Sequence, residues 1–263
     1  MAQAPTPDEA KPARRRPRKP RAELPLISLL PNALTLGAIC AGLTAIRMAA
    51  FGGISLAVAL IILAAILDGV DGRVARALGS QSNIGAELDS LADFVNFGVA
   101  PAMVLYFWAL KDAHELGWAA ALIYALCCCL RLARFNVGMK GDTPPDKRFF
   151  TGVPSPAGAL VALAPLFLSR VLPGHITLPA PFVAGWLVVS GGLMVSRLPT
   201  FSMKTTIYAE HAWAALVAVV AGVTLLTVYP WEMLLAFDVI YLVSIVWSVR
   251  TARRPEPPPT DAT

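Results

Sequence analysis

The 263-residue chain is poor in charged residues, in cysteine and in histidine, and these shortages exclude several classes of protein. Charged residues make up 15% of the chain and hydrophobic residues 56%, whereas soluble domains carry about 25% and about 45–50%. Three of the four cysteines are consecutive, at 127–129, and consecutive cysteines do not have the spacing of metal ligands. We find neither internal repeats nor sustained strand alternation. The composition therefore leaves no room for a separate soluble domain and gives no support to a cysteine-based metal site.

Long apolar segments fill most of the chain, and each is close to the roughly 20 residues that a helix needs to cross a bilayer. The candidate segments are approximately 28–50, 54–77, 90–110, 116–138, 154–172, 180–197, 209–229 and 231–249. The sequence therefore predicts an all-α fold, a polytopic integral membrane helical bundle with about eight transmembrane helices. We expect one membrane domain over residues 22–250.

Basic residues are distributed unevenly around these segments, and their distribution predicts the topology. Residues 1–21 are rich in Pro, Ala and Arg, so we expect a disordered basic tail, and residues 251–263 form a Pro-rich tail. The positive-inside rule, applied to eight spans, places both termini in the cytoplasm, in an inner membrane of the bacterial type. The basic tail serves either as a topology determinant alone or also as a contact for anionic headgroups, and we expect no nucleic-acid partner.

Four aspartates occur at fixed spacings between residues 68 and 93, next to apolar segments where carboxylates are costly. Asp68 and Asp71 are three residues apart and Asp89 and Asp93 four apart, so each pair projects from one helix face. The polar turn at 78–83 folds the two helices into a hairpin and brings all four carboxylates together near the cytoplasmic surface. Such hard oxygen ligands suit one or two Mg²⁺ or Mn²⁺ ions. The alternative is a polar helix cap at the membrane edge.

These residues match the pattern D-x-x-D-G-x-x-A-R, eight residues, then G-x-x-x-D-x-x-x-D, and the chain thereby resembles the CDP-alcohol phosphotransferases. The resemblance implies an enzyme in which an acceptor hydroxyl displaces CMP from a CDP-linked lipid. It also implies that Asp68, Asp71 and Asp89 bind a divalent metal, and we expect two ions of Mg²⁺ or Mn²⁺. Asp93 is the candidate general base and is assigned to the metal set as well.

Six further residues are candidates for binding the nucleotide and its phosphates. The small residues of the motif let a flat cytosine approach the helices closely. The arginine of the motif can pair with a phosphate. The resemblance adds two polar residues at the start of the first span. The set consists of Asn32, Thr35, Gly72, Ala75, Arg76 and Gly85. The alternatives are helix packing through the small residues, a salt bridge or headgroup contact for the arginine, and an ordinary helix start for the polar pair.

Three more segments, 93–101, 131–136 and 150–157, resemble the bacterial and archaeal phosphatidylserine synthase branch of this family. Asn96 departs from the Ser of that branch, and the loop at 197–204 resembles its counterpart only loosely. Two arginines on one helix face and three polar residues suit a zwitterionic acceptor. The candidate acceptor-binding residues are Arg131, Arg134, Asn136, Thr151 and Ser155. The alternative for the arginines is positive-inside anchoring.

The resemblance implies transfer of a phosphatidyl group from CDP-diacylglycerol to the hydroxyl of L-serine by direct, metal-assisted attack, giving phosphatidylserine and CMP. It also implies a homodimer. The alternative within the class is another acceptor: glycerol 3-phosphate, an inositol phosphate or choline. A divalent-cation transporter is the alternative from another class, and it predicts acidic residues at mid-membrane on several spans.

Overall fold

The computed structural model describes residues 29–80, 82–139, 149–174, 176, 178–196, 199–201 and 212–252. In chain order the elements are α1 (Leu30–Ala50), α2 (Ile54–Ala77), α3 (Asn83–Asp93), the π-helix η2 (Phe94–Val99), α4 (Ala100–Leu105), the π-helix η3 (Tyr106–Leu110), the 3₁₀ turn η4 (Lys111–Ala113), α5 (His114–Met139), β1 (Phe149–Thr151), α6 (Ser155–Val171), α7 (Ala180–Val195), β2 (Pro199–Phe201), α8 (Ala212–Val228) and α9 (Pro230–Ala252). The tail predicted at 1–21 lies outside the described residues, and α9 continues two residues into the segment assigned to the C-terminal tail.

The expectation of a helical membrane bundle is confirmed, whereas the count of eight spans is not established. Four helical stretches are long and apolar enough to cross a membrane: Leu30–Ala50, Ile54–Ala77, Asn83–Gly138 and Pro230–Ser248. The third is 56 residues long and turns back at His114, whose φ of 45° breaks the helix, so it contains two of the predicted segments. The apolar helices α6 and α7 have 17 and 16 residues, short of the roughly 20 that a span needs.

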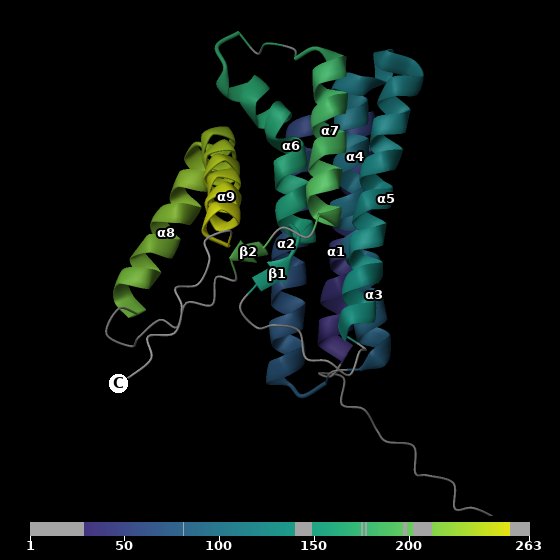
Figure 1. The fold of residues 1–263 in the computed structure, drawn as a ribbon. Helices are drawn as coiled ribbons and strands as arrows, with labels where there is room; N and C mark the ends of the chain where they lie inside the picture. The colour runs from purple at the N-terminus through teal and green to yellow at the C-terminus, as the bar shows by residue number, and fades with distance from the viewer. Residues whose placement is uncertain are drawn as a thin grey trace, which may run out of the picture.

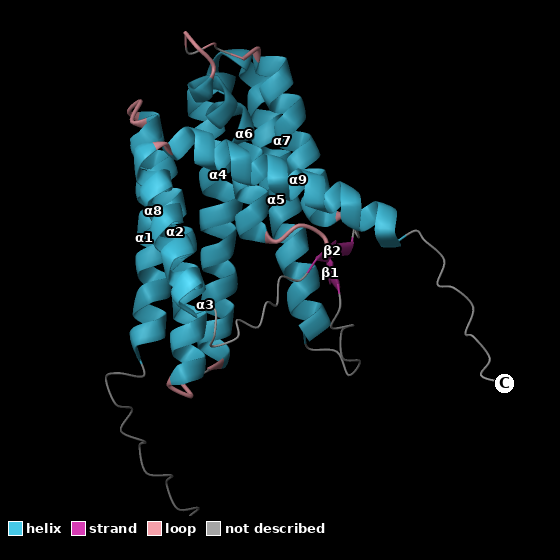
Figure 2. Cartoon of the chain, turned by 90° about the vertical axis from the view of Figure 1, so that its left-hand side faces the viewer, coloured by secondary structure: helices cyan, strands magenta, loops and turns pink. Residues whose placement is uncertain are grey.

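Helices α1, α2, α5 and α7 run alongside one another, and α8 and α9 lie together at one side (Figure 1). Figure 2 shows α9 strongly inclined against the long axis of the bundle, whereas α8 runs closer to that axis. Two three-residue strands, β1 and β2, pair antiparallel with Phe150 opposite Thr200. The strand pair thus joins the segment before α6 to the segment after α7.

The α1–α2 hairpin is closely packed because its contact faces carry small residues. Ala38, Ala45, Ala57 and Ala64 are fully buried, and small side chains let helix backbones approach closely in a membrane bundle. Gly52 makes the turn between the helices with a φ of +83°, a conformation that favours glycine. The hairpin thereby brings the start of α1 beside the end of α2.

The polar turn between α2 and α3 is built from two standard helix-end structures. Gly79, with a φ of +60°, ends α2 in a Schellman motif in which the Ser80 N–H donates to the carbonyl of Ala75 at 3.1 Å. Ser82 then caps α3, because its hydroxyl accepts from the Gly85 N–H at 3.0 Å. The two motifs fix the direction in which α3 leaves the turn, and therefore the direction of its aspartates.

Candidate active site

Three of the four predicted carboxylates form one cluster between α2 and α3. A carboxylate oxygen from each of Asp68, Asp71 and Asp89 lies within 4.8 Å of the other two. Asp71 is 3% exposed, Asp68 is half-buried and Asp89 is exposed. Three carboxylates at this separation repel one another unless a cation or protons neutralise them. The donor set, all hard oxygen and open on one side, fits a Mg²⁺ or Mn²⁺ ion.

The fourth aspartate, Asp93, lies beside this cluster and faces inward. Its carboxyl group lies close to that of Asp68, and its Oδ1 is buried with no partner among the residues that the structure describes. The π-helix η2 begins directly after Asp93. Such π-turns recur at functional sites because they redirect the side chains at that point in the helix. Asp93 thus presents a buried, unpaired oxygen at the edge of the acidic cluster.

The π-helix is held in place by a residue of α5. The Tyr124 hydroxyl is fully buried and donates to the carbonyl of Phe97 at 2.9 Å. A π-turn departs from the regular helical ladder, so its carbonyls need partners of this kind when they are buried. Tyr124 therefore supports the turn that follows Asp93 without lying in the cluster itself.

The sequence placed Thr35 at the nucleotide, and the structure gives its side chain a contact with the acidic cluster. The Thr35 hydroxyl donates to Asp71 Oδ2 at 2.6 Å, and it also lies 3.0 Å from the carbonyl of Pro31 in its own helix. Thr35 is 5% exposed. A hydrogen bond from a buried hydroxyl to a carboxylate is among the stronger protein hydrogen bonds. Thr35 therefore fixes the orientation of Asp71 from the neighbouring helix.

A cavity of about 320 Å³ opens beside the cluster, between the start of α1, the end of α2 and the start of α3. All six residues that the sequence assigned to the nucleotide line it, together with two of the aspartates. These eight are Asn32, Thr35, Asp71, Gly72, Ala75, Arg76, Gly85 and Asp89. A Cβ added at Gly85 would lie 3.1 Å from Asn32 Oδ1, so glycine at this position keeps the cavity open.

Sequence reasoning missed two serines that line the same cavity. Ser80 and Ser82 follow Gly79 in the turn, and the Ser80 hydroxyl is buried with no partner among the described residues. The sequence pattern indicates a turn at both positions and gives no sign of a role in binding. The available signal was their position in the turn between the two halves of the motif, five and three residues before Gly85, because a turn that brings two motif halves together also lines the space between them.

The five acceptor candidates separate into two groups in the structure. Arg131 is half-buried, donates to the Ser155 hydroxyl, and lies within electrostatic reach of Asp93. Arg134 is exposed and donates to the carbonyl of Val195 at 2.7 Å, which satisfies a free carbonyl at the end of α7. The arginines share the helix face that their spacing predicted, yet only Arg131 reaches the aspartates.

Asn136 and Thr151 complete this set. Asn136 Nδ2 donates to the Ser90 hydroxyl at 3.0 Å and ties α5 to α3 next to Asp89. Thr151 lies in β1, and the neighbouring Gly152 has a φ of +87° with the Ser196 carbonyl 2.7 Å from where its Cβ would stand. Only glycine fits at this position. The backbone packs closely here, three residues before α6 begins at Ser155.

An acidic cluster, a polar cavity beside it and a guanidinium within electrostatic reach of Asp93 thus lie together in a bundle of apolar helices. Residues 28–196 match the family model described as CDP-alcohol phosphatidyltransferase. The chain belongs to this family.

Curated relatives match nearly the whole chain. A protein of Mycobacterium leprae is 41% identical over 243 residues, which cover 90% of this chain and 79% of the relative. One of Mycobacterium tuberculosis is 41% identical over 230 residues, 86% of this chain and 80% of its own. One of Helicobacter pylori is 33% identical over 222 residues, 82% and 88% respectively. All three carry the name CDP-diacylglycerol–serine O-phosphatidyltransferase.

Proposed function

We propose that this chain transfers the phosphatidyl group of CDP-diacylglycerol to the hydroxyl of L-serine and releases CMP. One observation carries the proposal: two of the three clustered aspartates, Asp71 and Asp89, line the cavity, and Asp93 lies within electrostatic reach of both the cluster and Arg131. A donor phosphate and an acceptor hydroxyl can therefore meet at Asp93. The names of the relatives support the same reaction.

The donor binds with its cytidine in the 320 Å³ cavity and its pyrophosphate toward Asp71 and Asp89. Arg76, which lines the cavity, pairs with a phosphate oxygen. Asp68, Asp71 and Asp89 hold the divalent metal, which in our proposal is two ions of Mg²⁺ or Mn²⁺. Asp93 is able to share a ligand position. Bound there, the metal supplies charge stabilisation for the CMP leaving group.

Asp93 acts as the general base. The serine Oγ forms a bond to the phosphorus of the phosphatidyl group as the bond from that phosphorus to the CMP oxygen breaks, and the hydroxyl proton passes to Asp93. The buried Oδ1 of Asp93 is our candidate for the atom that accepts this proton. Arg131 and Ser155 lie on the acceptor side, and Asn136, Thr151 and Arg134 complete our proposed acceptor region.

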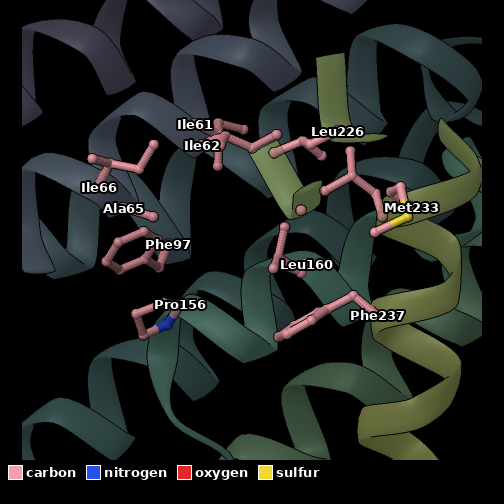
Figure 3. A pocket seen from close by; sticks show the side chains of 12 residues that line it. Ile61, Ile62, Ala65, Ile66, Phe97, Pro156, Leu160, Leu226, Met233 and Phe237 are labelled. Carbon is pink, nitrogen blue, oxygen red and sulfur yellow. The ribbon is translucent and has the colours of Figure 1, made fainter. Parts of the chain in front are cut away.

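A second cavity, of about 350 Å³ and lined almost entirely by apolar side chains, receives an acyl chain of the donor. Figure 3 shows its wall, formed by residues of α2, η2, α6, α8 and α9. Phe97 lies one turn beyond Asp93, and Pro156 directly follows Ser155. The cavity therefore begins where the glycerol end of a donor bound at the aspartates would lie.

We also propose a homodimer in an inner membrane of the bacterial type, with the active site and both termini on the cytoplasmic side. The basic residues of the sequence and the family resemblance support this orientation. The acidic cluster comes from the last part of α2 and the second half of α3, and we propose that this end of the hairpin faces the cytoplasm, where serine and nucleotide are found.

The test is CMP release by the purified protein in detergent with CDP-diacylglycerol and Mn²⁺ or Mg²⁺. We expect release that depends on L-serine and that EDTA abolishes. If CMP is released with glycerol 3-phosphate, inositol phosphate or choline but not with serine, the proposed acceptor is wrong and the proposed reaction class stands. Folded protein that releases no CMP with any of these alcohols would refute the proposal.

A further inference from the structure

Helix α9 brings Tyr241 to the acceptor side of the site, although nothing in the sequence assigned this helix a role. The ring of Phe237, one turn earlier, stacks on that of Tyr241 with centroids 6.3 Å apart and planes 3° apart. Phe237 and Pro156 line the same apolar cavity (Figure 3). Tyr241 is thereby placed one turn beyond the contact of α9 with the start of α6, where Ser155 lies.

Two buried hydrogen-bond donors without partners among the described residues lie in this region of the bundle. The Tyr241 hydroxyl and the Nε of Arg131 are both buried, and neither has a hydrogen-bond partner among the residues that the structure describes. The two side chains lie within electrostatic reach of each other. Arg131 already uses Nη1 to reach Ser155. Buried donors are nearly always paired in folded proteins, so two neighbouring unpaired ones call for an external acceptor.

The chemistry of these donors favours a carboxylate as that acceptor. The unpaired Nε–H of the guanidinium and the phenol O–H together offer two donors beside one positive charge, which match a singly charged anion with two oxygens. A phosphate dianion would favour a second cation, and Arg134, the next arginine on α5, is occupied by the carbonyl of Val195. The pair therefore suits an amino acid better than a phosphorylated alcohol.

We propose that Tyr241 is a further substrate-binding residue, which holds the carboxylate of the amino-acid acceptor together with the Nε of Arg131. This inference rests on the proposed serine transfer. It places the carboxylate of the acceptor toward α9 and its hydroxyl toward Asp93, since Arg131 lies within reach of both Tyr241 and Asp93. It also gives α9 a role in selecting the acceptor.

The test is Tyr241→Phe, which removes one hydroxyl and keeps the ring that stacks on Phe237. We expect the KM for L-serine to rise about tenfold to a hundredfold, the range for a lost hydrogen bond to a charged group. The inhibition constant of L-alanine, which keeps the carboxylate and lacks the attacking hydroxyl, should rise by the same factor. The KM for CDP-diacylglycerol should stay within twofold. Tyr229→Phe, at a tyrosine that is 54% exposed, is the matched control and should change none of these constants.

An unchanged KM for L-serine would overturn the inference, and so would a raised KM with unchanged inhibition by L-alanine. Equal weakening of serine and donor would indicate a structural role and would overturn it as well. Wild-type protein without serine-dependent CMP release would instead refute the proposed function, before the variants are compared.

Discussion

Replacing Thr35 with valine tests whether a residue of α1 controls the metal affinity of the acidic cluster. Valine keeps the shape of the side chain and removes the hydroxyl that donates to Asp71 Oδ2 at 2.6 Å. Hydrogen bonds to charged groups contribute about 1.5–3 kcal/mol, and partners of metal ligands typically change metal affinity 10- to 100-fold. We therefore expect the Mn²⁺ concentration for half-maximal CMP release to rise about tenfold or more, with kcat at saturating metal reduced much less.

Thr44→Val is the control for this experiment, because Thr44 lies on the same helix and its hydroxyl is bonded to the carbonyl of Cys40 instead. The control variant should keep the wild-type metal dependence. Unchanged metal dependence in Thr35→Val would refute the assignment of Thr35 as a support for Asp71. A lower kcat at every metal concentration, with the same half-maximal point, would contradict it equally and would return Thr35 to a role in nucleotide binding alone.

Two glycines give further predictions. In Gly42→Ala the new Cβ would clash with the buried Oδ1 of Asn96, so overpacking should lower the free energy of unfolding by about 1–3 kcal/mol. Thermal unfolding in detergent measures this loss, and Gly37→Ala, with its nearest neighbour at 3.8 Å, should lose no stability. In Gly85→Ala the Cβ enters the polar cavity 3.1 Å from Asn32 Oδ1, so the KM for CDP-diacylglycerol should rise severalfold while the KM for L-serine is unchanged. Equal unfolding midpoints for the first pair, or equal donor KM values for the last variant and wild type, would contradict the packing described here.

The parts of the site that were predictable from the sequence depend on short-range geometry. Spacings of three and four residues fix which aspartates share a helix face, and a polar turn with glycine indicates a hairpin. The structure brings Asp68, Asp71 and Asp89 together through these two rules, and the cavity follows from the same turn. The helix bounds were predictable for a similar reason: α1 and α2 begin and end within two residues of the expected segments, because proline and glycine mark their ends.

The parts that were not predictable depend on contacts between residues far apart in the chain. Thr35 and Asp71 are 36 residues apart, and no pattern in either helix indicates that they meet. Arg131 and Arg134 look equivalent by spacing, yet only the packing of α7 against α5 gives Arg134 a carbonyl to bind. The place of Tyr241 depends on the strong inclination of α9 (Figure 2), which hydropathy does not encode.

The most direct test of the central claim, that Asp93 is the base of a phosphatidyl transfer, is turnover by Asp93→Asn beside Asp112→Asn, a control at an exposed aspartate in η4. Asparagine keeps the size of the side chain and cannot accept the proton of the attacking hydroxyl. We predict that kcat for serine-dependent CMP release falls about 100- to 10,000-fold, while binding of CDP-diacylglycerol is retained and the control behaves as wild type. Turnover within tenfold of wild type in Asp93→Asn would contradict the account.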